Sequence, residues 1–334
     1  MQAGKLPLEY LETILAGLSS NDPRVALGPA AGEDAALIDM GDKYLVAKTD
    51  PITFATDRIG WYVVQVNAND IAVMGAVPKW MMATILLPEG SSEKEIESII
   101  AQLNEACDNI GVSLIGGHTE VTYDLPRPII SGVMLGEVEK GKEVRSSGAR
   151  EGDSIIMTKA IAIEGCSILA LEAGNRLIEA GLSQEDVDAG KRLLNNPGIS
   201  VVRDARISVA AGKITAMHDP TEGGITGGLR ELAMASNLGM AIDQNCIALT
   251  NTTRQYCDAL NLDPLGLIAS GSLLACVPPE DEKSVIAALW SEGIAAWKIG
   301  EMLEKSLGIK ITSGVGTRDL PKFERDEIAR FFSA

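Results

Sequence analysis

The chain has 334 residues, a net charge of −17 and a hydrophobic fraction of 46%, with only 4% aromatic residues. A chain of this length usually forms two domains. No block of Lys or Arg stands out, which argues against a nucleic-acid-binding surface. No apolar run reaches the roughly 20 residues of a membrane helix, and the N-terminus does not resemble a signal peptide. We therefore expect a cytoplasmic protein that binds neither nucleic acid nor membranes.

The first half of the chain is predicted to mix helices and strands. An amphipathic helix ends before Pro23, and the helix that opens at Asp57, a candidate N-cap, ends at Gly75. Apolar residues recur with a helical period over residues 92–111, and Gly111 provides the C-terminal stop. The pattern also predicts a hairpin over 35–53, with its turn at 40–42, and strands over 80–88, 112–117 and 127–138.

A polar stretch over residues 139–153 carries three glycines and lacks an apolar period. We place a boundary near residue 147, between an N-terminal domain of residues 1–147 and a C-terminal domain of residues 148–334. Each half mixes both element types, so we expect an α+β fold with helices on one face of a mixed sheet in each domain. In the second half we expect strands over 154–161, 213–219, 270–277, 296–303 and 307–312, helices over 164–180, 184–194 and 199–211, and a glycine-rich turn and helix over 220–239.

The five cysteines form no C-x-x-C pair. Cys107 lies on a helix's apolar stripe, and Cys276 lies in an apolar strand pattern. Reduced core thiols are the simplest interpretation, and they suit a reducing compartment. The spacing gives no support for a zinc site.

Acidic residues recur beside glycine or proline near the ends of predicted elements. Asp34 precedes a strand and Asp50 ends one, and either could be a simple turn residue. Asn67 and Asp70 share one face of the very apolar helix in "VNANDIAVMGA". Because unpaired burial of such groups costs on the order of several kcal/mol, they need either a metal ion or a buried hydrogen-bond network.

Two further motifs lie at predicted strand ends. In "LIGGHTEV", His118 could be a metal ligand, a catalytic base or a buried structural histidine, and Glu120 follows two residues later. In "HDPTEGG", Asp219 precedes a glycine-rich helix start, whose free N–H groups would suit an anion. The alternative is a flexible turn that Asp219 caps. Carboxylates suit Mg²⁺ and its phosphate ligands, and neither a P-loop nor a G-x-S-x-G nucleophile motif is present.

The motifs "GEDAALI", "KTD", "VNANDIAVMGAVP", "IGGHTEV" and "HDPTEGGITGGL" occur in one order along nearly the whole chain. Together they resemble the aminoimidazole ribonucleotide (AIR) synthetase superfamily, also called PurM-like. The superfamily includes the hydrogenase maturation protein HypE, thiamine-monophosphate kinase and selenophosphate synthetase. The C-terminal half resembles HypE most, notably in "LNLDPLGLIASGSLLACV" and "WKIGEM".

The resemblance implies a homodimer formed through the N-terminal sheets, with ATP and Mg²⁺ bound between the domains near the dimer interface. It implies that Asp219 lies at the phosphates or metal and His118 near the phosphates, as hydrogen-bond donor or acid/base. Asn67 would support Asp70. The implied metal ligands are Asp34, Asp50 and Asp70, with Glu120 as a replacement ligand, and the implied cofactor-binding residues are Gly32, Asn67, Gly116, Gly117, Gly223 and Gly224.

The sequence departs from HypE at two points. HypE-like proteins carry a C-terminal cysteine that accepts a carbamoyl group, whereas this sequence ends "ERDEIARFFSA". HypE and thiamine-monophosphate kinase have aspartate where this chain has His118.

Three hypotheses on function follow. The first is a Mg²⁺-dependent, HypE-like enzyme that uses ATP to activate or phosphorylate an amide, carboxylate or phosphate oxygen of a small-molecule or protein-borne acceptor. The second is a small-molecule kinase like thiamine-monophosphate kinase. The third is a non-catalytic ATP-binding scaffold in metal-centre assembly, with a maturation protein as its partner.

Overall fold

The computed structural model describes residue 6 and residues 8–18, 21–30, 32–53 and 57–333. These residues form two compact units. Both are α+β structures with one mixed sheet each, which confirms the predicted fold class. Among the described residues, no helix is both long and apolar enough to cross a membrane. The N-terminal unit comprises Ser19–Pro29 and Asp34–Glu143, and the C-terminal unit comprises Val144–Ala334 with Met1–Leu18 and Ala30–Glu33.

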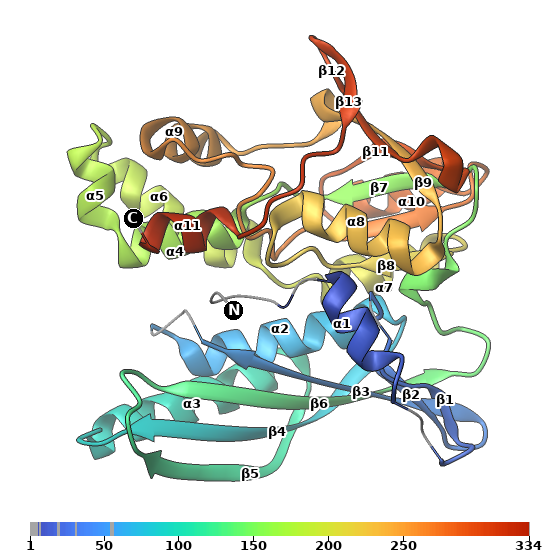
Figure 1. The fold of residues 1–334 in the computed structure, drawn as a ribbon. Coiled ribbons are helices and arrows are strands. Elements are labelled where there is room, and N and C mark those ends of the chain that lie inside the picture. Colours follow the sequence, from blue (N-terminus) through green and yellow to red (C-terminus); the bar gives the residue numbers. More distant parts are fainter. Residues whose placement is uncertain (1–5, 7, 19–20, 31, 54–56, 334) are drawn as a thin grey trace. The chain divides into compact units, whose positions relative to one another are not determined.

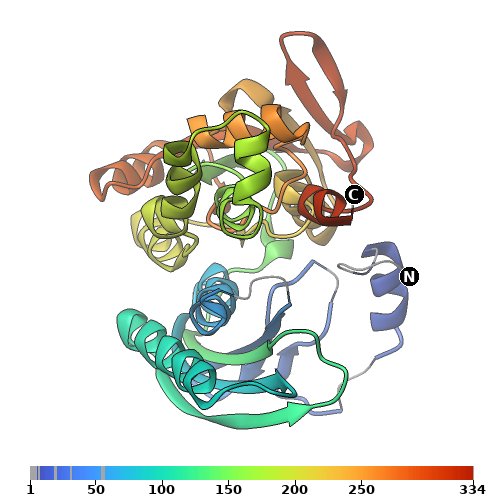
Figure 2. The ribbon, with the colours of Figure 1, turned by 90° about the vertical axis from the view of Figure 1, so that its left-hand side faces the viewer.

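The N-terminal unit is a six-stranded sheet with two helices on one face (Figures 1 and 2). The strand order is β1-β2-β3-β6-β4-β5, in which β4 and β5 are parallel and the other neighbours are antiparallel. The elements are β1 (Val25–Leu27), β2 (Ala36–Asp39), β3 (Lys43–Ile52), α2 (Ile59–Val73), β4 (Val77–Pro88), α3 (Glu93–Ile110), β5 (Ser113–Thr122) and β6 (Ile129–Glu139).

The two helices differ as their sequences predict. Helix α3 is amphipathic, begins after the capping side chain of Ser92 and ends at Gly111 with φ 70°. Helix α2 is mostly apolar and almost wholly buried, and it packs against β3, β6 and α3. The expectation that Asp57 caps α2 is wrong. The N-cap position is Arg58, which has a left-handed backbone and makes no side-chain cap, so the chain enters α2 through a tight turn.

Two glycines of β6 allow α2 to pack closely against the sheet. A Cβ on Gly132 would lie 2.6 Å from Asn67 Nδ2, and a Cβ on Gly136 would lie 2.3 Å from Ile71 Cγ2. Contacts under 3 Å are not tolerated, so any larger residue would push α2 outward. The face of the sheet that carries these glycines is therefore the one that α2 covers.

The C-terminal unit is a seven-stranded sheet of order β13-β12-β9-β11-β7-β10-β8, parallel only between β12 and β9. Its core is aliphatic, as the composition predicts. The β12–β13 hairpin projects from the rest of the unit (Figure 2). The strands are β7 (Ser154–Thr158), β8 (Ala216–His218), β9 (Gly239–Asp243), β10 (Leu274–Val277), β11 (Ala296–Leu303), β12 (Ile309–Ser313) and β13 (Gly316–Asp319). The helices are α1 (Leu8–Leu15), α4 (Ile163–Glu172), α5 (Gly174–Glu179), α6 (Gln184–Leu193), α7 (Val202–Ala211), α8 (Gly224–Ser236), α9 (Asn251–Leu260), α10 (Glu282–Ser291) and α11 (Glu327–Ser333).

Several predicted boundaries shift. The helix expected over 164–180 is two helices, α4 and α5, which meet at Ala173 and Gly174. Strand β5 continues to Thr122, so His118 and Glu120 lie inside a strand rather than at its end. Asp50 likewise lies within β3, because pairing with β6 continues to Ile52.

Candidate functional site

The N-terminal unit holds a group of charged side chains between β3 and α2. Lys48 and Asp50 occupy alternate positions of β3, and Asp50 pairs with Gly132, whose helix-covered face contacts Asn67. Both side chains therefore point toward α2. Asp70 comes from α2 and is 4% exposed. The structure thus brings Asp50, Asn67 and Asp70 to one place. The helix spacing predicted this for Asn67 and Asp70, and the family resemblance implied it for Asp50.

The amide of Asn67 has a fixed orientation. Its Nδ2 donates to Val63 O at 2.8 Å and to Asp50 O at 3.2 Å. Two carbonyl acceptors on one side of the amide identify that side as the NH₂ group. The Oδ1 atom is therefore directed elsewhere, and it is buried without a hydrogen-bond partner. A buried carbonyl oxygen beside carboxylates fits a hard cation such as Mg²⁺.

The electrostatics of Asp70 also fit a cation. Burial, opposed by the Lys48 ammonium and assisted by the carboxylates of Asp50 and Asp34, raises the pKa of Asp70 to about 7. Lys48 Nζ lies 3.4 Å from Asp70 Oδ2 and 3.7 Å from Asp50 Oδ2. A bound divalent cation would stabilise these negative charges. The oxygens of Asp50, Asp70 and Asn67 therefore fit a cation such as Mg²⁺, and Asp34 is close enough to affect the charge of Asp70.

His118 and Glu120 lie elsewhere in the same unit. They pair with Thr84 and Leu86 of β4, which face away from the helices, and His118 Nε2 lies 3.1 Å from Glu120 Oε2. Their side chains are 65% and 50% exposed. Strand β5 is the edge strand, three strand spacings or about 14 Å from β3. Within one chain, the structure does not bring either residue to Asp70, because they occupy the opposite face of the sheet.

Gly116 and Gly117 allow β5 to pair closely with β4. Their φ values are 157° and 155°, and a Cβ on Gly117 would lie 2.0 Å from Ala83 O. The pairing of β4 and β5 shifts register between Met81 and Met82, opposite Gly116. These glycines thus have a structural reason inside the sheet, and binding of a cofactor to them remains a prediction.

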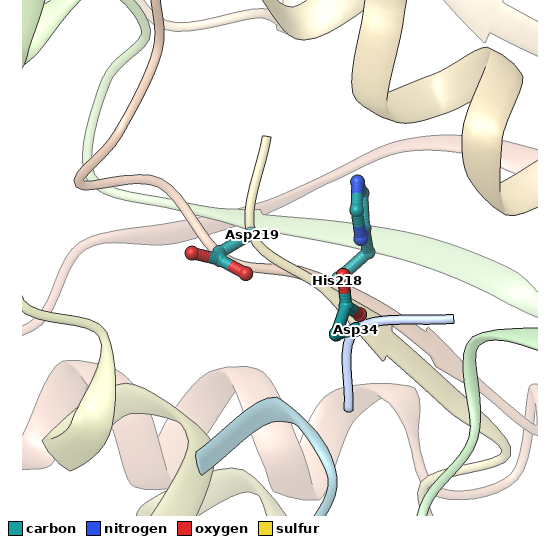
Figure 3. A group of neighbouring side chains, drawn as sticks. All are labelled: Asp34, His218 and Asp219. Carbon is teal, nitrogen blue, oxygen red and sulfur yellow. The ribbon is translucent and has the colours of Figure 1, made fainter. Parts of the chain in front are cut away.

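In the C-terminal unit, His218 ends β8 and Asp219 follows it (Figure 3). Both are buried, with exposed fractions of 4% and 2%. His218 Nε2 lies 2.9 Å from Glu231 Oε2 of α8. Sequence reasoning selected Asp219 but not His218, although His218 is one of only two histidines in the chain. Asp34, also labelled in Figure 3, belongs to the N-terminal unit.

The glycine-rich turn before α8 is more tightly packed than expected. Gly223 and Gly224 have φ values of 82° and 66°, and a Cβ on Gly224 would lie 2.4 Å from Leu265 O. The Gly223 N–H donates to Asp326 Oδ2 at 2.7 Å, and the Gly224 N–H donates to Thr221 O at 3.1 Å. The expectation that these two amides are free for an anion is therefore wrong. Asp219 is also not a helix cap, since the N-cap residue of α8 is Gly223.

The remaining predicted residue, Gly32, belongs to the C-terminal unit. Its φ is 83°, and a Cβ there would lie 3.1 Å from Glu231 O and from Ala235 Cβ. The neighbouring Glu33 accepts hydrogen bonds from the N–H groups of Ser146 and Ser147. This contact fixes Glu33 against the C-terminal unit.

Two buried acids of the C-terminal unit were missed from the sequence. Burial, opposed by a hydrogen bond with Ser270 and assisted by the charges of Asp326 and Glu222, raises the pKa of Glu164 to about 7. Glu164 Oε2 is buried without a hydrogen-bond partner. Burial also raises the pKa of Asp326 to about 7, although three backbone N–H groups donate to it. The one sequence signal was the acid inside the apolar run "AIAIEGCSILA".

The fold and these residues define a two-domain α+β protein with a carboxylate group beneath a buried helix in one unit and a glycine-rich turn in the other. Residues 32–138 match the family AIR synthase related protein, N-terminal domain, and residues 150–312 match AIR synthase related protein, C-terminal domain. The chain belongs to the AIR synthase-related family.

Curated relatives carry names from hydrogenase maturation. A hydrogenase expression/formation protein of Methanocaldococcus jannaschii is 31% identical over 328 residues, which cover 95% of this chain and 94% of the relative. Carbamoyl dehydratase HypE of Rhizobium leguminosarum is 29% identical over 275 residues, which cover 80% of this chain and 75% of the relative.

Solved structures share the fold. HypE in complex with ATP has a TM-score of 0.72 at 24% identity, covering 95% of this chain and 96% of that one. HypE in its complex with HypF has a TM-score of 0.75 at 21% identity, covering 93% and 98%. ThiL complexed with AMPPCP and TMP has a TM-score of 0.72 at 20% identity, covering 94% of each chain. At these identities the likeness establishes the fold alone.

Proposed function

We propose that this protein is a Mg²⁺-dependent, ATP-using enzyme of the HypE type, which activates or phosphorylates an amide, carboxylate or phosphate oxygen. The observation that carries the proposal is the group of Asp50, Asp70 and the fixed Oδ1 of Asn67, which offers oxygen ligands in a buried place. The names of the curated relatives and the ATP complex of a structural neighbour support it.

Each part of the proposed site has a separate task. Asp34, Asp50 and Asp70 would hold the metal. Strand β3 and helix α2 would fix the positions of Asp50 and Asp70 before the nucleotide arrives. Bound Mg²⁺ supplies positive charge that neutralises phosphate oxygens. Asn67 keeps Asp70 and β3 in register through its bond to the Asp50 carbonyl. Asp219 of the C-terminal unit is proposed to act near the phosphates of a bound nucleotide.

The cysteines favour an acceptor other than the chain's own described thiols. All five are free, and four are buried. Burial raises the pKa of Cys107 to about 11 and that of Cys166 to about 12, so neither forms a thiolate readily. Free buried thiols also support our proposal that the protein works in the reducing cytoplasm.

ATP binding by calorimetry, with and without Mg²⁺, tests the metal site. Wild-type protein should bind ATP with Mg²⁺, and Asp70→Asn should weaken binding at least about tenfold, since one charged ligand is lost. Asp108→Asn is the matched control, because Asp108 is exposed on α3. If wild-type protein fails to bind ATP in either condition, the proposed function is wrong.

We also propose a homodimer that uses the open face of the N-terminal sheet. This face carries exposed apolar side chains, among them Val77 and Ile115 at 57% and 53% exposure. In a dimer, His118 and Glu120 on this face would serve the partner chain's phosphates. Light scattering should give twice the chain mass for wild-type protein and a smaller mass for Ile115→Glu.

A separate variant tests the role of His118. His118→Ala should still bind ATP with Mg²⁺ but lose turnover. If His118→Ala only lowers the melting temperature, His118 has a structural role.

A small-molecule kinase is the second candidate, supported by the likeness to ThiL with its nucleotide analogue. An assay with thiamine monophosphate separates the two, because a HypE-like enzyme should not phosphorylate it. The third candidate is an ATP-binding scaffold, which the structure of a HypE–HypF complex suggests. That candidate fails if the purified protein hydrolyses ATP or transfers its phosphate and Asp70→Asn abolishes the reaction.

A further inference from the structure

Lys48 places a positive charge inside the carboxylate group. Its Nζ lies between Asp50 and Asp70, 3.7 and 3.4 Å from their Oδ2 atoms. The Lys48 side chain is only 22% exposed, and that of Asp70 is 6% exposed. This pair is therefore poorly screened by water, unlike an ion pair on the surface.

Lys48 faces α2 because of the alternation along β3. Val46 and Ile52, in the same alternate set, are fully or largely buried, and Asp50 shares their face. Lys43, an odd-numbered neighbour on the same strand, instead pairs with Glu137 at 2.9 Å. The position of Lys48 among the acids is thus set by strand register rather than by a chance surface contact.

A metal ion and the Lys48 ammonium need the same carboxylate oxygens. Two positive charges about 4 Å apart repel each other strongly where the effective dielectric constant is roughly 20. Lysine also has a flexible four-carbon stem, so its ammonium can move to a new acceptor. The phosphates of a nucleotide would provide such an acceptor next to the metal.

We propose that Lys48 is an internal counter-cation that weakens binding of a free divalent ion and makes metal binding depend on the nucleotide. In the nucleotide-free protein Lys48 pairs with Asp50 and Asp70. With metal and nucleotide present, Lys48 would exchange the carboxylates for a phosphate oxygen, and Asp50 and Asp70 would be free to hold the metal. This inference rests on the proposed metal site. It adds a positioning residue that couples the two ligands, and such coupling is reciprocal.

Mn²⁺ binding followed by electron paramagnetic resonance tests this coupling without turnover. Mn²⁺ is measured alone and with a non-hydrolysable ATP analogue, on wild-type protein and on Lys48→Met, Lys48→Gln and Lys48→Arg. We expect Mn²⁺ alone to bind Lys48→Met at least about tenfold more tightly than wild-type protein, because the competing charge is gone. The analogue should strengthen Mn²⁺ binding much more in wild-type protein than in that variant. Lys48→Arg, which keeps the charge, should behave as wild-type protein does.

Lys43→Met is the matched control, since it removes a lysine from the same strand without touching Asp50 or Asp70. Lys48→Gln repeats the test with a polar neutral side chain should Lys48→Met fold poorly by circular dichroism. If Mn²⁺ alone binds the neutral variants no more tightly than wild-type protein, the inference is wrong while the metal site stands. If Mn²⁺ binds none of the proteins, even with the analogue, the proposed function itself fails.

Discussion

Glu164 lies buried at the start of α4, and its charge should make the C-terminal unit less stable at high pH. Burial raises the pKa of Glu164 from its usual 4.5 to about 7. At 1.36 kcal/mol per pKa unit, ionising this carboxyl in the fold costs about 3 kcal/mol more than in the unfolded chain. Below pH 4.5 both states are protonated and there is no penalty. Between pH 4.5 and about 7 the unfolded chain has released the proton while the folded chain still holds it, so stability falls as the pH rises and levels off above about 7.

Glu164→Gln keeps the shape of the side chain and removes this titration. The new amide N–H groups lower the free energy of unfolding by an amount that does not depend on pH. The test is therefore how the difference in free energy of unfolding between variant and wild type changes with pH. We expect the free energy of unfolding of the variant, relative to wild type, to rise by about 2–3 kcal/mol between pH 5 and pH 8.

Urea unfolding followed by tryptophan fluorescence measures this difference. Trp290 and Trp297 stack edge to face in the C-terminal unit, so Trp61→Phe and Trp80→Phe in all samples restrict the signal to that unit. Glu172→Gln, at the exposed end of the same helix, is the control and should show no such trend. A difference that stays constant from pH 5 to pH 8 would refute the reasoning and mean that water or a cation reaches Glu164.

Three further substitutions test packing and buried hydrogen bonds. Asp326→Ala leaves three backbone N–H groups without their acceptor, so thermal unfolding should show a loss of about 3 kcal/mol or more, against almost none for the exposed Glu324→Ala. Tyr256→Phe removes a buried hydroxyl that donates to a carbonyl of α6 at 2.9 Å, and urea unfolding should show a loss of about 1–2 kcal/mol; an unchanged midpoint would mean that the bond is dispensable. Gly60→Ala would place a Cβ 2.5 Å from a carbonyl oxygen of α3. The N-terminal unit should therefore lose about 1–3 kcal/mol of stability and melt at a lower temperature. Equal melting curves would show that α2 and α3 can move apart without cost.

The sequence predicts those features that depend on local pattern. The helical period identified α3, and the i, i+3 spacing correctly placed Asn67 and Asp70 together in α2. The family resemblance was confirmed because the motifs span both domains. Elements with weak patterns, such as α9 and the edge strand β13, were missed.

Features that depend on distant residues could not be predicted. Strand β5 continues past His118 because β4 provides a long parallel partner, which no local pattern around "GGHTE" reveals. Asp326, which is 103 residues away in the sequence, accepts the hydrogen bond of the Gly223 N–H group. Lys48 looked like an ordinary charged residue until its register placed it between Asp50 and Asp70.

The close packing of α2 on Gly132 and Gly136 has a consequence for comparing related chains. A Cβ at either glycine would lift α2 from the sheet and separate Asn67 and Asp70 from β3. If the proposed metal site is correct, we expect related chains that keep the site to keep glycine at both strand positions.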